Sequence, residues 1–268
     1  MNPYSDLYKA KNLRDRGKYR AAIAKYEQAE EKLPRFSVDT QVIHVSFPAF
    51  LKYYIAFCYT QLAEAEGDVS LYIKAEAAAK ESYEMAIIPS DQSDALYLWG
   101  YILFKQARYE EARAKFEAAL IGIPPQNQLG ADFTADTLFV LGKALIELGD
   151  EPAARQVFGR LEARIEAFLP SYNRAEAFYG LGKAYLQLGD TTAAQRVFGK
   201  LEVQIEADLQ EFGYHFRGID FYEQTLYGLG KVYLQLGDEP TAHRVFGRLL
   251  KHYPDSAHKD EVKHLLEK

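Results

Sequence analysis

The sequence predicts an all-α array of about six helix hairpins, followed by a C-terminal capping helix. The clearest evidence is a stretch from Tyr179 to Asp190, which returns almost unchanged as Tyr227 to Asp238 and more loosely as Phe139 to Asp150. The residues after each copy also recur, at 153–161, 193–201 and 241–249. Such self-similarity is typical of repeat proteins, in which each unit buries its hydrophobic face against its neighbours.

The first helix of each predicted unit is centred on a small residue, which we call the anchor. The anchors recur at intervals of 46, 44, 42, 40 and 48 residues, and they are Ala10, Ala56, Gly100, Gly142, Gly182 and Gly230. Apolar residues one before and three after most anchors have the spacing of a single helix face. Because glycine inside a helix costs roughly 1 kcal/mol, its presence indicates that a neighbouring helix approaches closely there.

A break and a second helix follow each first helix. The later breaks pair a glycine with an aspartate, as in Gly149-Asp150 and Gly189-Asp190. The glycine ends one helix, and a proline such as Pro152 fits the first turn of the next, where no backbone donor is needed. Each second helix then carries a small residue and, four positions later, an aromatic one. These pairs are Ala22/Tyr26, Ala79/Tyr83, Ala112/Phe116, Ala154/Phe158, Ala194/Phe198 and Ala242/Phe246.

The third unit has the fullest form of the pattern, which runs through Leu96, Trp99, Gly100, Leu103, Tyr109, Ala112, Phe116, Ala119 and Pro124. This pattern resembles the tetratricopeptide repeat family, and the resemblance covers nearly the whole chain. It implies a right-handed solenoid that forms one array over residues 1–268. We expect units at about 3–34, 49–89, 93–124, 135–169, 175–209 and 223–254, longer than the ~34 residues usual in the family. A capping helix at 256–267 would cover the last unit with Val262, Leu265 and Leu266.

The resemblance also implies which residues face a partner. In such arrays the first helices line a concave groove, at positions three before and one after the anchor. The first set includes Tyr53, Tyr97, Phe139, Tyr179 and Tyr227, and the second includes Phe57, Tyr101, Lys143, Lys183 and Lys231. We call these ten the groove residues. Tyrosine offers a large contact area with a hydrogen-bonding tip, and lysine meets carboxylates, so we expect a protein or peptide partner with acidic or aromatic residues.

Plainer interpretations of the groove residues stay open. The aromatic side chains also suit packing between neighbouring helices, and the lysines suit a solvated face paired with Asp136, Glu147 or Glu176. Recent duplicates share lysines whether or not anything binds them. Some family members hold the C-terminal carboxylate of chaperones with a lysine and asparagine clamp, but the matching asparagines are absent here.

Composition argues against two classes of partner. The formal net charge of −6 disfavours nucleic acid, because such binders gain most of their affinity by neutralising phosphates. No apolar run approaches the ~20 residues that span a bilayer, so we expect no membrane insertion. The N-terminus has no signal-peptide layout, which favours a cytoplasmic location, or a periplasmic one if a signal has been removed. The single cysteine, Cys58, lies in an aromatic helix and is expected to be buried.

No motif predicts a catalytic, cofactor or metal site. Lys183 follows two glycines but precedes Ala184 inside a helix, whereas a phosphate-binding loop needs a serine or threonine there. His252, His258 and His264 lie six residues apart, which does not place them on one helix face. No Ser/His/Asp or Cys/His set can be nominated. We therefore expect no enzyme activity.

The sequence thus predicts a non-catalytic scaffold or adaptor that binds a protein segment in its groove. The alternative is a structural subunit of a larger assembly, built through end caps and the linkers at 35–48 and 210–220. The segment Leu249–Ser256 is similar to the repeat ends of bacterial envelope assembly proteins, which favours this alternative. The sequence does not determine the oligomeric state.

Overall fold

The computed structural model describes residues 3–32, 47–121, 131–169, 171–212 and 219–267. Within these ranges every regular element is an α-helix, so the predicted all-α class is confirmed. The helices are α1 (Pro3–Asp15), α2 (Tyr19–Lys32), α3 (Phe47–Glu66), α4 (Val69–Met85), α5 (Pro89–Lys105), α6 (Tyr109–Ile121), α7 (Ala131–Glu147), α8 (Glu151–Phe168), α9 (Ser171–Gln187), α10 (Thr191–Phe212), α11 (Ile219–Gln235), α12 (Glu239–His252) and α13 (Lys259–Leu266).

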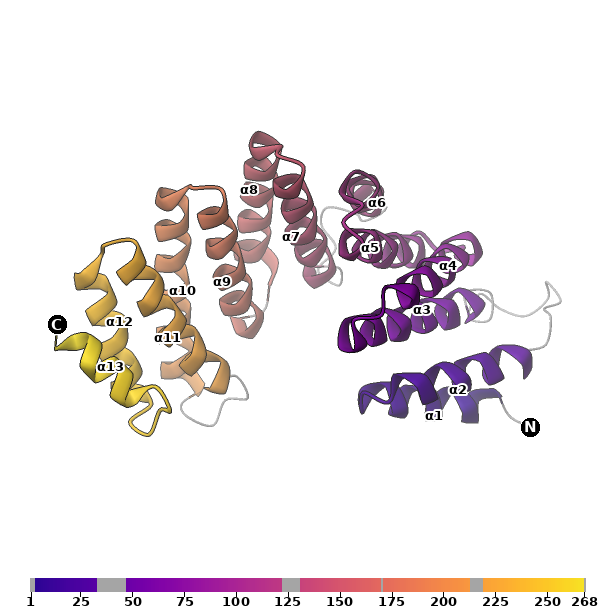
Figure 1. Cartoon of the computed structure of the whole chain (residues 1–268), viewed down its shortest axis with the longest axis horizontal. Coiled ribbons are helices and arrows are strands. Elements are labelled where there is room, and N and C mark those ends of the chain that lie inside the picture. Colours follow the sequence, from indigo (N-terminus) through magenta and orange to yellow (C-terminus); the bar gives the residue numbers. More distant parts are fainter. Residues whose placement is uncertain (1–2, 33–46, 122–130, 170, 213–218, 268) are drawn as a thin grey trace. The chain divides into compact units, whose positions relative to one another are not determined.

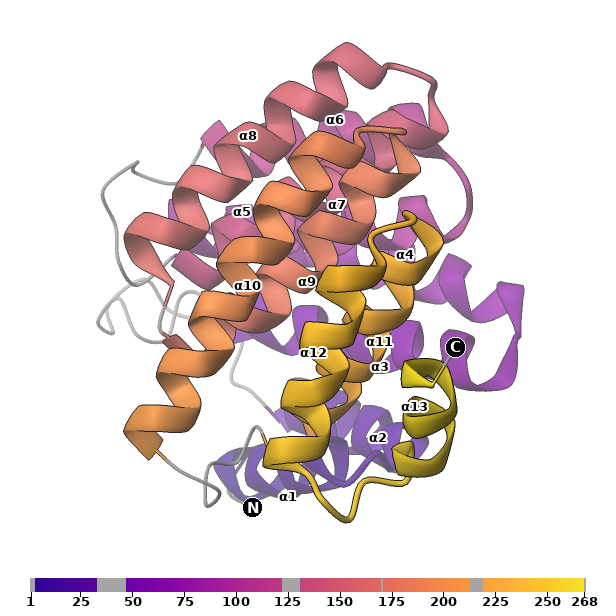
Figure 2. The same cartoon turned by 90° about the vertical axis from the view of Figure 1, so that its left-hand side faces the viewer.

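The chain divides into two compact units, Met1–Leu161 and Glu162–Lys268. In the first unit, α1 packs on α2, α3 on α4 and α5 on α6, and each hairpin also contacts the helix that follows it (Figure 1). In the second unit, α9 packs on α10 and α11 on α12, and α13 lies next to α12 (Figure 2). The expected single array over residues 1–268 stays a prediction.

The glycine–aspartate breaks end one helix and begin the next. Gly149 has φ of +74° and Gly189 has φ of +66°, a left-handed conformation that residues with a Cβ rarely adopt. The Asp150 carboxylate then accepts a hydrogen bond of 3.2 Å from the backbone N–H of Ala153 and so caps α8. Two adjacent residues therefore set each sharp reversal of the chain.

The anchors allow the two helices of a hairpin to touch. A Cβ on Gly100 would lie 2.8 Å from the ring of Phe116, and Gly142 meets the ring of Phe158 more closely still. Gly182 and Gly230 meet the fully buried rings of Phe198 and Phe246 in the same way. Each of these four phenylalanine rings thus occupies the space left by the glycine anchor of its own first helix. The close approach expected from the sequence is confirmed.

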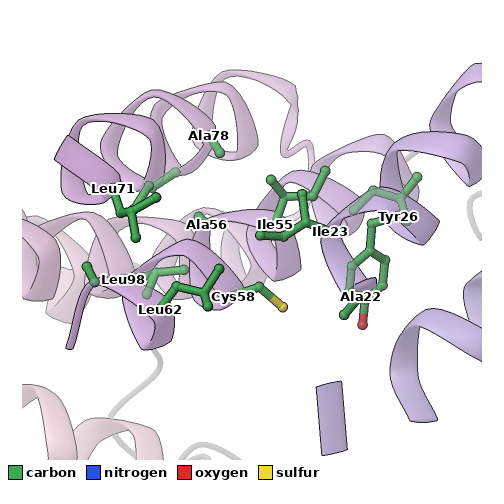
Figure 3. Close-up of a cluster of buried hydrophobic side chains, with 14 of the residues drawn as sticks. Ala22, Ile23, Tyr26, Ile55, Ala56, Cys58, Leu62, Leu71, Ala78 and Leu98 are labelled. Carbon is green, nitrogen blue, oxygen red and sulfur yellow. The ribbon is translucent and has the colours of Figure 1, made fainter. Parts of the chain in front are cut away.

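The core of the first two hairpins is a continuous apolar cluster (Figure 3). Tyr26 of α2 is 1% exposed and stacks on Tyr54 of α3, with their ring centroids 5.7 Å apart. Cys58 is completely buried in this cluster, and its burial raises the pKa of its thiol to about 12. The thiol therefore stays protonated and acts as a small apolar side chain, as predicted.

None of the described helices has the length and apolarity needed to cross a membrane.

Replacing either of two glycines of the second unit with alanine distinguishes the cost of a packing clash from the gain in helix propensity. Gly182→Ala should lower the free energy of unfolding by about 1–3 kcal/mol, because the new methyl group collides with Phe198. Gly199→Ala should raise it by up to about 1 kcal/mol, because a Cβ at Gly199 meets no atom within 4 Å and alanine favours the helix. Urea unfolding followed by circular dichroism measures both changes. Equal effects of the two substitutions would contradict the packing role.

Candidate functional site

In the first unit, the groove residues lie on α3, α5 and α7, and α5 packs against both of the other helices. All six of these side chains are half-buried. Tyr97 shows why, since its ring lies 5.2 Å from Phe133 of α7, 6.1 Å from Phe116 and 6.4 Å from Tyr101. Burial also raises the pKa of Tyr97, so its hydroxyl stays protonated and able to donate. The rings are thus held in place by neighbouring helices and remain partly accessible.

Tyr53 and Phe57 of α3 are packed against the core cluster of the first hairpins. Tyr53 makes an edge contact with Tyr54 at 5.3 Å, and Phe57 makes one with Tyr19 at 6.5 Å. Part of each ring is therefore packed against other side chains of the protein, in agreement with the packing interpretation.

On α7, the two groove residues are an aromatic one, Phe139, and a lysine, Lys143. The Lys143 ammonium lies 5.8 Å from the ring centroid of Phe139 and 5.7 Å from that of Phe104. Nearby on α5, the Tyr101 hydroxyl donates to Glu64 at 2.9 Å, and Lys105 pairs with the same carboxylate at 2.7 Å. Lys143 forms no salt bridge with a described residue, so the structure does not show the alternative pairing of Lys143 with Asp136 or Glu147.

In the second unit, the groove residues form two Tyr–Lys pairs, one on α9 and one on α11. Lys183 lies 5.4 Å from the ring centroid of Tyr179, and Lys231 lies 5.1 Å from that of Tyr227. Residues four apart lie on one helix face, so each lysine extends over its own tyrosine. Both lysines are exposed.

The capping helix α13 occupies the Tyr–Lys pair of α11. The Tyr227 hydroxyl donates to Glu261 at 2.7 Å, and the Lys231 ammonium lies 3.5 Å from the other oxygen of that carboxylate. The ring of His258 stacks on Tyr227 with a centroid distance of 3.7 Å. The Tyr227 hydroxyl, assisted by Lys231, holds the pKa of Glu261 below its usual range.

From the sequence, we expected α13 to cover the last hairpin with apolar side chains only. Val262 is indeed completely buried, and Leu265 and Leu266 are half-buried. The sequence gives only a weak signal for the contacts of His258 and Glu261 with α11. A histidine three residues before a glutamate is a common pattern, and the partners Tyr227 and Lys231 lie about 30 residues away.

The second helices of the second unit carry a repeated ion pair that the sequence analysis missed. Glu162 is 5% exposed and binds Arg196 and Lys200. The equivalent residue Glu202 is 4% exposed and binds Arg244 and, at 2.8 Å, Arg248. The Tyr233 hydroxyl donates to Glu202 at 3.2 Å as well. Each carboxylate therefore joins one second helix to the next.

Three of the surface hollows formed by described residues lie away from the groove residues. Two flank α10, with volumes of about 470 Å³ on the side of Arg174 and about 370 Å³ on the side of Arg248. The third, of about 340 Å³, lies between the first three helices, near Tyr8 and Phe50. In the described part of the chain, no group of three or more histidine, cysteine, aspartate or glutamate residues is arranged to hold a metal. Residues 35–46 and 213–218 of the two linkers lie outside the described residues.

Comparisons with known proteins agree with this architecture. Models of the tetratricopeptide repeat match residues 60–127, 139–198 and 224–256. No curated protein matches the sequence.

Solved structures are similar at low sequence identity. A putative kinesin light chain from Podosopora anserina with nearly identical TPR-like repeats is 14% identical, with a TM-score of 0.55 over 78% of this chain and 98% of its own. The apo form of RapI is 14% identical, with a TM-score of 0.57 over 100% of this chain and 96% of its own. A Rap protein complexed with competence and sporulation factor is 13% identical, with a TM-score of 0.50 over 94% and 76%. These similarities confirm the predicted fold class, a solenoid of helix hairpins.

Removing one buried carboxylate tests the joint between second helices. Glu202→Gln should lower the free energy of unfolding by about 1–3 kcal/mol, because it weakens two ion pairs and one hydrogen bond. The cations are partly exposed, which keeps the loss below that of a fully buried pair. Urea unfolding measures the loss. Glu206→Gln, at a carboxylate 34% exposed and 4.0 Å from Arg248, is the control and should cost less than about 0.5 kcal/mol.

Acidification should loosen α13. A carboxyl group whose pKa is lowered in the folded state stabilises the contact above its ordinary pKa of 4.5, and this stabilisation is lost as the pH falls through the folded value. At neutral pH, Glu261→Gln should lower the hydrogen-exchange protection of α13 amides by roughly two- to fivefold and remove its dependence on acid. Unchanged protection in this variant would contradict the role of Glu261, and Glu267→Gln serves as the matched control.

Proposed function

Because the chain belongs to the tetratricopeptide repeat family, we propose that it is a non-catalytic scaffold that binds a protein or peptide segment across its first helices. The observation that carries the proposal is the recurrence of an aromatic side chain at the same position of successive first helices, with a lysine beside it in the last three. Tyr179 with Lys183 on α9 is the clearest instance.

The aromatic groove residues suit binding because their positions are set before a partner arrives. Tyr97 is held between α5 and α7, and Tyr53 is held against the core cluster. A side chain that is already ordered loses little conformational entropy on binding, so more of the contact energy appears as affinity. The tyrosine hydroxyls are protonated at neutral pH and can donate to a partner, and burial raises the pKa of both residues further.

The lysines favour a partner with acidic residues. Lys143 and Lys183 lie over aromatic rings and form no salt bridge with a described residue. A carboxylate of a partner would supply the missing counter-charge and would add orientation and faster association. The similarity of fold to a Rap protein that was solved in complex with competence and sporulation factor adds support from a different protein.

A structural role in a larger assembly is the second candidate. Large apolar side chains are exposed on second helices, notably Ile73 at 67%, Ile121 at 85% and Val203 at 72%. Val203 also lies between the two hollows that flank α10. An assembly that covered these residues would use the second helices and would leave the groove residues free.

Affinity purification with matched charge reversals tests the scaffold proposal. The wild-type chain, a Lys143→Glu/Lys183→Glu variant and a Lys74→Glu/Lys251→Glu variant would be incubated with native lysate, and bound proteins quantified by mass spectrometry. The control lysines are exposed and lie on second helices, one in each unit. Lys231 is left unchanged because it contacts Glu261.

We expect a partner retained by the wild type and by the control variant but reduced at least about tenfold by the groove variant, which corresponds to about 1.4 kcal/mol. Circular dichroism would check that all three chains are folded. Equal recovery with all three chains would exclude the lysines as part of the binding surface. A partner lost after Val203→Ser alone would instead support the assembly role.

A further inference from the structure

We propose that Tyr179 and Lys183 of α9 bind a carboxylate of an acidic partner segment, in the same way that Tyr227 and Lys231 of α11 bind Glu261. This inference rests on the proposed scaffold function and assigns the ligand chemistry of one position on that surface.

The two Tyr–Lys pairs are equivalent in sequence and similar in their distance from ammonium to ring. They lie at the same places relative to the anchors Gly182 and Gly230. The distance from the ammonium to the ring centroid is 5.4 Å in the α9 pair and 5.1 Å in the α11 pair. In the α11 pair the Lys231 ammonium also donates to the Tyr227 hydroxyl, at 3.2 Å. Both lysines are exposed and both tyrosines are half-buried. What one pair binds is therefore chemically suited to the other.

The chain itself shows what such a pair binds. The two oxygens of Glu261 are shared between the Tyr227 hydroxyl, at 2.7 Å, and the Lys231 ammonium, at 3.5 Å. A neutral donor and a cation thus meet one carboxylate, and hydrogen bonds to a charged acceptor are stronger than those between neutral groups. His258, three residues before Glu261, adds a ring stacked on Tyr227.

The α9 pair differs because its neighbouring helix supplies no carboxylate. The Tyr179 hydroxyl faces Gly228 of α11, so closely that a Cβ on Gly228 would collide with it. Where α13 presents Glu261 to the hydroxyl of Tyr227, α11 therefore presents a glycine to the hydroxyl of Tyr179. Lys183 forms no salt bridge with any residue that the structure describes. Among the described residues, no carboxylate pairs with Lys183, and this leaves the position open to a carboxylate of a partner.

Charge complementarity and the example of α13 together define the occupant. It is a protein segment with a glutamate or aspartate that reaches both the Tyr179 hydroxyl and the Lys183 ammonium. Residues 256–267 of this chain offer such a glutamate with His258 three residues before it. The position of α13 itself is not reproduced on α9, because Gly228 of α11 lies against the Tyr179 hydroxyl.

A synthetic peptide with the sequence of residues 256–267, blocked at both ends, is a suitable probe because it carries this glutamate and histidine. It would be titrated into the full-length chain with ¹³C-methylated lysines, and the signals of Lys183 and Lys231 would be followed separately by NMR. The matched control peptide replaces the glutamate at position 261 with glutamine. Lys183→Met and Tyr179→Phe variants test the site, and Lys74→Met is the control for a lysine on a second helix.

We expect the glutamate peptide to shift the Lys183 signal in a saturable way and the glutamine peptide to bind about tenfold more weakly. Tyr179→Phe should weaken this binding about threefold, and Lys74→Met should leave it unchanged. Because Lys183→Met removes the Lys183 signal, its loss of binding is followed by the fluorescence anisotropy of a labelled peptide. Equal binding of the two peptides, or shifts at Lys231 without shifts at Lys183, would overturn the inference, as would the absence of any shift at Lys183.

The affinity purification described above shows whether only the carboxylate site at Tyr179 and Lys183 is wrong, or whether the scaffold function is wrong as well. If a partner is recovered that depends on the groove residues but is retained fully by Lys183→Met and by Tyr179→Phe, the scaffold stands and the carboxylate site is wrong. If no recovered protein depends on the groove residues, the proposed function itself fails.

Discussion

The contact between a glycine on the first helix and a phenylalanine ring on the second is the constraint on which the last four hairpins depend. Gly142, Gly182 and Gly230 each sit against a completely buried ring. The absence of a Cβ brings the two helix backbones close, and that approach sets where every other residue of the first helix points. The rings and lysines of the groove surface follow from the same register, three before and one after the anchor.

Two kinds of contact then join one hairpin to the next. Between first helices the joint is aromatic, as where Tyr97 of α5 meets Phe133 of α7. Between second helices of the second unit it is ionic, as where buried Glu202 binds Arg244 and Arg248. A buried carboxylate with several partners fixes geometry more than it adds stability, since desolvation offsets much of its attraction.

The capping helix shows how an array ends and what its surface accepts. An outermost repeat leaves one face without a neighbour, and α13 covers that face with Val262. Its Glu261 also fills the polar position that a tyrosine and a lysine create on α11. The same helix therefore covers the apolar face of the last hairpin and places a carboxylate against the Tyr–Lys pair of α11.

The sequence by itself determined the all-α repeat fold, the hairpin breaks and the burial of Cys58, because these depend on local spacing that recurs along the chain. It also placed the groove residues on first helices. Only the tertiary structure decided that Lys231 is occupied by Glu261, that Lys183 is not paired with Glu176, and that Glu162 and Glu202 are buried. The contacts of Lys231, Glu162 and Glu202 join residues 30 to 46 positions apart, and their meeting follows from helix packing and leaves no periodic signal in the sequence.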